Sequence, residues 1–350
     1  MQEQTLSNEV DIRRKKIDDL RAMGEIPYKE KFERTCTIAE AREKVGQRVK
    51  IAGRIIFKRV MGKFGFIQIR DINAKIQVSV GRNELDEQSY DFYKKMIDIA
   101  DFVGVEGEVY LTQTGEVTVR AEKVTLLSKT LRSLPEKFHG LTDAETIYRQ
   151  RYLDLITNEK SRQVFLTRSK IESFIRRYLE DNGFLEVETP VLQTSVSGAS
   201  AKPFFTHHNA LDITCNLRIA TETWLKQCIC AGFDRVFEMG KDFRNEGMDP
   251  SHLQEFTQVE WYASYWNFED NIKFFYNMVN KMLTECLGTT KITYQGQEIE
   301  FASEWPRINY VEKMNEILGF DCLAEEDVDA FKKKVVEKGL YSYGELEECK

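Results

Sequence analysis

The fold is set by two neighbouring stretches of sequence, RVFEMGKDFRNEG at residues 235–247 and EFTQVEWY at residues 255–262. Their strand-forming residues predict strands at 235–243 and 256–263, on either side of a loop from Arg244 to Glu255. Alternate residues of a strand share a face, so Arg244 and Glu246 are expected to point together. The next strand would carry a second group on one face, Phe256, Gln258, Glu260 and Tyr262. Adjacent antiparallel strands with these faces would form one pocket.

These residue types suit a phosphate-bearing substrate. An arginine can bind an anionic oxygen in fork geometry, as nucleotide phosphates require. An aromatic ring can stack on a base, and carboxylates can bind an exocyclic amine or a substrate ammonium group. A strand pair with ordinary cross-strand ion pairs would carry the same residues. From the residues alone, both interpretations remain open.

Helices and short strands surround this strand pair. Residues 161–182 place their apolar side chains on one helical face, and Gly183 is a suitable terminator. A short strand at 185–187 is stopped by Thr189 and Pro190. The other predicted elements are helices at 222–230, 271–287 and 310–318 and a hairpin at 292–301.

The first part of the chain has a different, strand-rich pattern. Strands are predicted near 49–53, 65–69, 76–80, 102–111 and 116–124, with a helix at 91–99 between the third and the fourth. This is the layout of an OB-fold, a barrel often used for oligonucleotides, although a generic small β-barrel fits the periodicity equally well. The predicted division is a basic helix at 1–30, the barrel at 31–130, a linker at 131–144 and a second domain at 145–350.

Composition excludes several classes of protein. The chain has 350 residues and a net charge of -7, yet residues 1–63 carry 16 basic against 10 acidic side chains. A basic N-terminal segment suits a module that faces nucleic acid, but also an ordinary solvated helix face. The seven cysteines form no Cys-x-x-Cys pair, which argues against a zinc ribbon or a disulfide framework. No apolar run approaches a membrane span and the start lacks a signal-peptide pattern, so we expect a cytoplasmic protein.

Several blocks resemble one family of enzymes. The Phe243-Arg244-Asn245-Glu246 core resembles motif 2 of the class II aminoacyl-tRNA synthetases, and GFLEVETPVL at 183–192 resembles motif 1, which forms their dimer interface. Four further blocks are similar to lysyl-tRNA synthetases in particular: FHGLTD at 138–143, YRQRYLDLI at 148–156, THHNALD at 206–212 and MGK at 61–63. The resemblance runs from about residue 9 to about residue 320. It implies an α+β protein, with an OB-fold barrel followed by a class II catalytic domain that is incomplete at its C-terminus.

The resemblance also implies roles for individual residues. Arg244 would be the catalytic residue and would bind the ATP α-phosphate and the lysine carboxylate. Three residues would complete the ATP site: Glu246 at the adenine amino group, Phe256 stacked on adenine, and His252 beside the triphosphate. The amino-acid site would consist of Gly198 and Glu222 at the α-amino group, with Glu260 and Tyr262. In the barrel, Arg59, Phe66 and Gln77 match anticodon-binding positions, although Phe66 could instead belong to the barrel core.

The implied substrates and partners are ATP with Mg²⁺, L-lysine, tRNA(Lys), and a second copy of the chain bound through motif 1. The sequence departs from the family in reading Ala220-Thr-Glu222 for Ala-Pro-Glu, and His252-Leu-Gln-Glu-Phe256 for His-Asn-Pro-Glu-Phe. Motif 3 does not occur in the 350 residues. The Mg²⁺-binding carboxylates are expected there, so no metal ligand is assigned.

Two alternatives follow from these departures. The chain could be a tRNA-binding fragment or truncated relative without activity. An asparaginyl- or aspartyl-tRNA synthetase would share the barrel and both motifs. The block at 206–212 and the pair Glu260 and Tyr262 argue against it, because they suit a cationic substrate.

Overall fold

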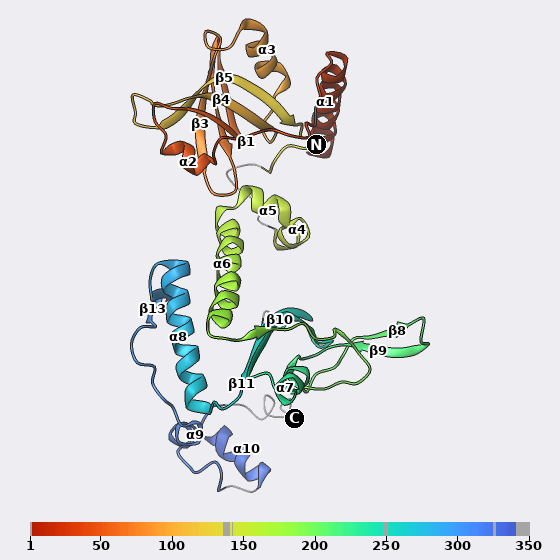
Figure 1. Cartoon of the computed structure of the whole chain (residues 1–350), viewed down its shortest axis with the longest axis vertical. Helices are drawn as coiled ribbons and strands as arrows, with labels where there is room; N and C mark the ends of the chain where they lie inside the picture. Colours follow the sequence, from red (N-terminus) through yellow and green to blue (C-terminus); the bar gives the residue numbers. More distant parts are fainter. Residues whose placement is uncertain are drawn as a thin grey trace. The chain divides into compact units, whose positions relative to one another are not determined.

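The computed structural model describes residues 2–135, 141, 143–247, 249, 251–324 and 327–340. Most of the block at 138–143 lies outside the described residues. The chain forms two compact units, Met1–Gln163 and Val164–Lys350, and each is described separately (Figure 1).

The N-terminal unit is built on a closed five-stranded barrel with the strand order β1-β2-β3-β5-β4 (Figure 1). Its strands are β1 (Arg48–Met61), β2 (Phe64–Arg70), β3 (Lys75–Gly81), β4 (Phe102–Leu111) and β5 (Val117–Ser128). Its helices are α1 (Gln2–Ala22), α2 (Ile38–Arg42), α3 (Glu87–Met96), α4 (Ala144–Arg149) and α5 (Arg151–Thr157). The predicted layout, five strands with one helix between the third and the fourth, is confirmed.

Helix α3 differs from its predicted position at 91–99. Asp86 is its N-cap, and the Asp86 side chain accepts a hydrogen bond from the Ser89 backbone N–H at 2.8 Å. This bond satisfies a backbone donor that the first turn leaves free, so the helix begins at Glu87. Apolar spacing alone placed the start too late. The short helices α2, α4 and α5 were not predicted.

A β-bulge in β1 controls which side chains enter the barrel. Before the bulge, odd-numbered residues such as Ile51 and Ile55 are buried. The pairing with β2 then shifts by one residue between Ile55 and Phe57. Beyond the shift the parity reverses: Phe57 and Arg59 are exposed, while Val60 packs against the barrel core. The bulge therefore turns Arg59 to the outer face.

Buried charges fasten α1 to the barrel. The Arg13 guanidinium donates to the carbonyl oxygens of Ile99 and Thr130, each at 3.1 Å. Lys16 Nζ lies 2.7 Å from Asp98 Oδ1. Since Arg13 is only 5 % exposed, losing these bonds would leave a desolvated cation. The basic helix is thus an integral part of the barrel unit.

The second unit begins within α6 (Glu159–Asp181). Its other helices are α7 (Glu222–Cys230), α8 (Phe268–Leu287), α9 (Tyr310–Leu318) and α10 (Val328–Glu337). Strands β6 (Leu185–Glu186), β10 (Arg235–Phe243) and β11 (Glu255–Ala263) form one sheet, ordered β11-β10-β6. A second sheet is ordered β7-β9-β8, from β7 (Leu192–Gln193), β8 (Phe205–His208) and β9 (Ile213–Leu217), and β12 (Lys291–Tyr294) pairs with β13 (Gln297–Glu300).

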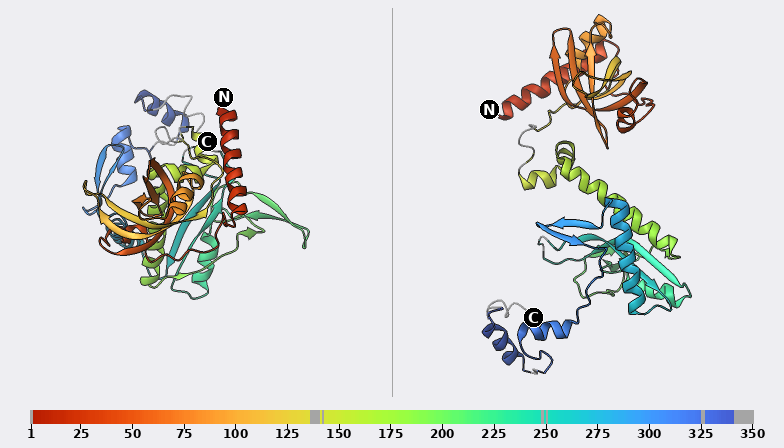
Figure 2. Two further views of the ribbon diagram at one scale, coloured as in Figure 1. Left: turned by 90° about the horizontal axis from the view of Figure 1, so that it is seen from above. Right: turned by 90° about the vertical axis from the view of Figure 1, so that its left-hand side faces the viewer.

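An aromatic core joins α6 and α8 to one face of β10 and β11. Tyr178 of α6 and Phe274 of α8 have ring centroids 5.3 Å apart, and Trp261 of β11 lies 6.0 Å from Phe274. Phe237 of β10 is fully buried in the same cluster. Helices α6 and α8 lie beside β10 and β11 (Figure 2). Their aromatic residues fill one face of the sheet, so the alternate residues of β10 and β11 lie on the opposite face. No helix among the described residues is long and apolar enough to cross a membrane.

Candidate functional site

The register of β10 and β11 brings polar residues together on the face away from the aromatic core. Glu238 pairs with Glu260 and Asp242 with Phe256 in the antiparallel ladder. Directly paired residues of a ladder share a face, as do residues two apart along one strand. The pairing continues one residue past β10, where the Arg244 N–H donates to the Gln254 carbonyl oxygen at 2.8 Å. Arg244 therefore lies at the open end of this polar face.

Arg244 is held beside an aromatic ring. Its guanidinium carbon lies 5.1 Å from the centre of the Phe256 ring. Its Nε donates to the Ile219 carbonyl oxygen at 3.4 Å. A cation over an aromatic face at this distance is attracted to it. The predicted combination of a guanidinium and an aromatic plate is present, in a geometry that leaves other guanidinium N–H groups available for an anion.

Glu246 and His252 lie in the loop after β10. The Glu246 N–H donates to the Arg244 carbonyl oxygen at 3.0 Å, which forms a tight turn. Strand alternation ends there, so the argument that Glu246 and Arg244 share a strand face does not hold, and Glu246 is exposed. His252 is also exposed, and its Nδ1 lies 2.6 Å from Asp249 Oδ2. Neither side chain contacts Arg244 in the hydrogen bonds described.

Glu260 lies at the centre of the polar face. Tyr262 Oη donates to one of its carboxylate oxygens at 3.3 Å, and Gln258 Nε2 donates to the other. Burial raises the pKa of Glu260, and the nearby Glu222 carboxylate raises it further. Burial also raises the pKa of Tyr262, with the Glu260 and Glu222 charges adding to the effect. A bound cation would relieve this unfavourable concentration of negative charge.

Gly198 and Glu222 meet at the start of α7. Gly198 has a φ of +87°, and an added Cβ would lie 3.0 Å from the Ala220 Cβ and 3.4 Å from the Glu222 Cβ. Both the left-handed backbone and this close approach favour glycine. Lys226, one turn along α7, donates to the Glu222 carboxylate. Lys226 thus neutralises the Glu222 carboxylate, which the sequence predicts to bind the α-amino group of the substrate.

Beneath the site lies a buried charge network that the sequence did not suggest. Arg218 is 2 % exposed, and its Nη1 donates to Glu238 Oε1 at 2.5 Å and to the Thr189 carbonyl oxygen at 3.1 Å. Its Nε lies 3.2 Å from Asp242 Oδ1, in an orientation that makes no hydrogen bond. Gly240 provides the space, because a Cβ there would collide with the Arg218 guanidinium.

Asp242 is the least satisfied member of this network. It is fully buried, and neither carboxylate oxygen has a hydrogen-bond partner among the described residues. Burial raises its pKa to about 6, against the attraction of Arg218 and Arg244 and with the repulsion of Glu260 and Glu238. Strand alternation counted back from Arg244 could have found Asp242. Arg218 comes from a distant segment, and no local pattern marks it.

In the N-terminal unit, Arg59, Phe66 and Gln77 all lie on the outer face of the barrel. Arg59 pairs with Phe66 across β1 and β2, and Phe66 pairs with Ser79 of β3, two residues from Gln77. Phe66 is half-buried and packs edge-on against Phe64, with ring centroids 4.9 Å apart. Phe66 is therefore not a barrel-core residue. The three residues present a cation, an aromatic ring and an amide, the types that bind single-stranded bases.

Comparisons with known proteins identify a family for each part of the chain. The family of class II tRNA synthetases (D, K and N) matches residues 143–341, and the OB-fold nucleic acid binding domain matches residues 49–127. A lysine–tRNA ligase of Streptococcus mutans is 46% identical over 97% of this chain and 72% of its own length. Those of Lactococcus lactis subsp. cremoris and Streptococcus pneumoniae are 44% and 45% identical over the same shares. The chain belongs to the lysine–tRNA ligase family. This places it among the class II aminoacyl-tRNA synthetases, with an OB-fold domain before the catalytic domain, as the sequence predicts.

The residues of this synthetase that the structure describes offer no group of three or more His, Cys, Asp or Glu side chains able to hold a metal ion. His207, from the THHNALD block, is exposed, and its Nε2 lies 3.3 Å from Asp212 Oδ1. No Mg²⁺ ligand is therefore assigned among the described residues.

Proposed function

We propose that this chain activates L-lysine with ATP to form lysyl-adenylate and transfers the lysyl group to tRNA(Lys). The observation that supports this most directly is the shared face of β10 and β11, with Arg244 over Phe256 at one end and Glu260 with Tyr262 at the other. The proposed domains are the anticodon-binding barrel at 31–130 and the catalytic domain at 145–350, joined by a linker at 131–144.

In the proposed reaction the lysine carboxylate attacks the α-phosphorus of ATP. A carboxylate oxygen–phosphorus bond forms and the bond to the pyrophosphate oxygen breaks. Negative charge develops on the α-phosphate oxygens, and Arg244 would stabilise it while also holding the carboxylate. Phe256 would stack on adenine, and the exposed Glu246 and His252 would reach the adenine amino group and the triphosphate. Positioning both substrates contributes the remainder of the rate enhancement.

The carboxylates provide the proposed selectivity for lysine. Burial and the nearby Glu222 charge raise the pKa of Glu260, so this carboxylate lacks a counter-charge. The substrate α-ammonium group would replace the Lys226 contact to Glu222, and the side-chain ammonium of lysine would supply the missing counter-charge at Glu260. An aspartate or asparagine side chain would not supply that charge, which favours lysine over the substrates of the related synthetases.

We also propose a homodimer that acts in the cytoplasm. Apolar side chains are exposed in the motif 1 block, where Leu185 is 49 % and Leu192 53 % exposed, and in the preceding helix α6, where Val164 is 65 % exposed. An apolar surface of this kind suits a protein interface. Mg²⁺ is proposed as a companion of ATP, and no step is assigned to it here because the described residues do not form a metal site.

Calorimetric titration of the 350-residue chain with a lysyl-sulfamoyl adenosine, a stable mimic of lysyl-adenylate, tests the proposal. We expect it to bind more tightly than the aspartyl and asparaginyl analogues. Glu260→Gln, which keeps the shape but removes the charge, should weaken binding at least tenfold. Preference for the aspartyl analogue would overturn the assignment to lysine. A lysine-dependent ATP–pyrophosphate exchange assay on the same chain separates an active enzyme from a tRNA-binding protein without activity.

A further inference from the structure

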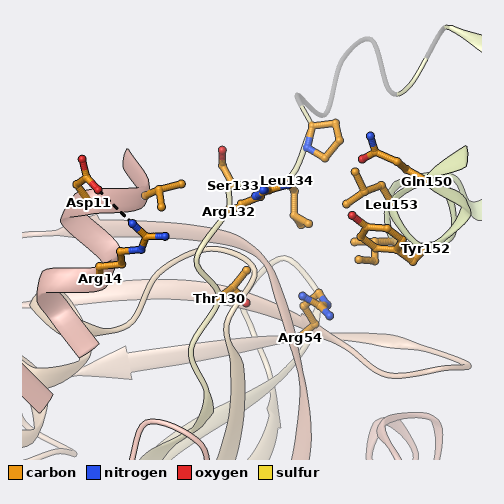
Figure 3. Close-up of a pocket in the computed structure, with 13 residues that line it drawn as sticks. Asp11, Arg14, Arg54, Thr130, Arg132, Ser133, Leu134, Gln150, Tyr152 and Leu153 are labelled. Carbon is orange, nitrogen blue, oxygen red and sulfur yellow. Dashed lines mark ion pairs between the residues drawn. The ribbon is translucent and has the colours of Figure 1, made fainter. Parts of the chain in front are cut away.

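A separate cavity of about 710 Å³ lies within the N-terminal unit (Figure 3). Its walls come from α1, β1, the segment at 130–135 that follows β5, and α5. This volume is typical of pockets that bind small organic molecules. None of the residues so far assigned to ATP, lysine or the anticodon lines it.

One side of the cavity is cationic. Three arginines line it, as Figure 3 shows: Arg14 of α1, Arg54 of β1, and Arg132 of the segment at 130–135. Among its lining residues the only carboxylate is that of Asp11, whose Oδ1 lies 3.8 Å from Arg14 Nη1. The lining therefore has an excess of positive charge, which favours an anionic ligand.

The other side is largely apolar. Tyr152, Leu153 and Ile156 of α5 line it, and the segment at 130–135 adds the apolar Leu134 and Pro135 to the lining. In Figure 3, Tyr152 and Leu153 lie across the cavity from Arg132 and Leu134. Tyr152 is 60 % exposed, so its ring is available to a ligand. A flat or apolar group would be favoured on this side, and a phosphate on the other.

The walls are held in place by contacts of their own. Arg54 donates to the Ala100 carbonyl oxygen at 3.0 Å and stacks over the Phe102 ring at 4.2 Å. The Thr130 N–H donates to Asp101 Oδ1 at 2.8 Å. Arg70 of β2 donates to the Ile156 carbonyl oxygen, which fixes α5 against the barrel. The cavity is thus preformed, and binding would require little ordering of the protein.

The cavity also continues the outer face that carries the candidate anticodon residues. Arg54 pairs with Arg70 on the same two strands on which Arg59 pairs with Phe66. Arg59 lies five positions after Arg54, which in an extended strand is a span of about 17 Å. The bulge between them keeps both arginines on the outer side. Because the cavity adjoins the candidate anticodon residues, its position suits a ligand that is chemically related to nucleic acid.

We propose that this cavity binds a nucleoside phosphate, with the phosphate between Arg14 and Arg132 and the base or sugar against Tyr152 and Leu153. The guanidinium groups match phosphate geometry, and the apolar side matches a ring. The nucleoside phosphate could be part of an RNA strand bound on the adjoining face, or a free nucleotide. The site is distinct from the ATP site proposed on β10 and β11.

The test uses the 350-residue chain and two probes, uridine 5′-monophosphate and a tRNA(Lys) transcript. Uridine lacks the adenine amino group, so the probe discriminates against the proposed ATP site. The variants are Arg14→Met and Arg132→Met. The matched control is Arg21→Met, because Arg21 also lies on α1, is 63 % exposed against 66 % for Arg14, and has a similar pair with Asp18 at 3.6 Å. The exposure of Arg14 makes loss of folding through that substitution unexpected.

We expect the two variants to weaken binding at least tenfold, and Arg21→Met to change it less than twofold. Loss of uridine monophosphate affinity with unchanged tRNA affinity identifies a free nucleotide. Loss of tRNA affinity, with a shallower dependence on salt, identifies an RNA strand. No saturable uridine monophosphate binding, together with equal tRNA affinities in all three variants, would overturn the proposal. That result would leave binding of the lysyl-adenylate mimic unaffected, so it would not bear on the proposed activation of lysine.

Discussion

Replacing Asp242 by asparagine should stabilise the second unit at neutral pH. The folded pKa of about 6 lies above the model-peptide value of 3.8, so the folded state favours the protonated carboxyl. Stability attributable to this group is therefore greatest below about pH 4 and is lost as the pH rises to about 6. A shift of about two pKa units corresponds to about 3 kcal/mol. Asparagine has the same shape and cannot ionise, while Arg218 retains Glu238 as its partner.

The four tryptophans provide the assay, since Trp224, Trp261, Trp266 and Trp305 all lie in the second unit. Urea unfolding followed by tryptophan fluorescence should show Asp242→Asn more stable than the parent by up to about 3 kcal/mol at pH 7.5. The two proteins should converge near pH 4. The exposed Asp234, just before β10, serves as the control when replaced by asparagine. An Asp242→Asn protein that is less stable at pH 7.5, or a difference that does not change with pH, would refute the reasoning.

Three further predictions concern single substitutions. Arg244→Ala should reduce adenylate formation at least a hundredfold, about 3 kcal/mol, in pyrophosphate exchange by any active form of the enzyme, and near-normal exchange would contradict its assigned role. Phe66→Ala should weaken tRNA(Lys) binding by about 1–3 kcal/mol in a filter-binding assay, with the barrel intact by circular dichroism; unchanged affinity would mean that no base stacks there. Gly240→Ala should destabilise the second unit by about 1–3 kcal/mol in urea unfolding, because the new methyl group meets the buried Arg218 guanidinium, whereas Gly247→Ala, at an open position, should have little effect.

Local sequence patterns predicted the parts of the fold that depend on local physics. Helix α7 and strand β10 have the predicted bounds, because each has a clear period and a clear end. Gly183, with a φ of +81°, follows the end of α6 as predicted. The contact between the Arg244 guanidinium and the Phe256 ring followed from alternation along two neighbouring strands.

The remainder depends on contacts between distant segments. Arg218 reaches Glu238 across 20 residues, and nothing near either residue marks the pair. The bulge in β1 has no sequence signal that we identified, although it decides that Arg59 faces outward. The shared face predicted for Arg244 and Glu246 does not form for a local reason, because both residues follow the end of β10 and the tight turn after Arg244 breaks strand alternation.

The bulge in β1 has a consequence for how this strand tolerates mutation. On the N-terminal side of the bulge, substitutions at odd positions such as Ile51 should be poorly tolerated and those at even positions well tolerated. On the C-terminal side the phase is reversed, so that substitutions of Arg59 should be tolerated for stability and those of Val60 should not. In a deep mutational scan of β1, the alternation of tolerant and intolerant positions should therefore shift by one residue at the bulge. Deleting Ile56 would remove the extra residue together with the shift, so the alternation along β1 would become regular and Arg59 would keep its place on the outer face.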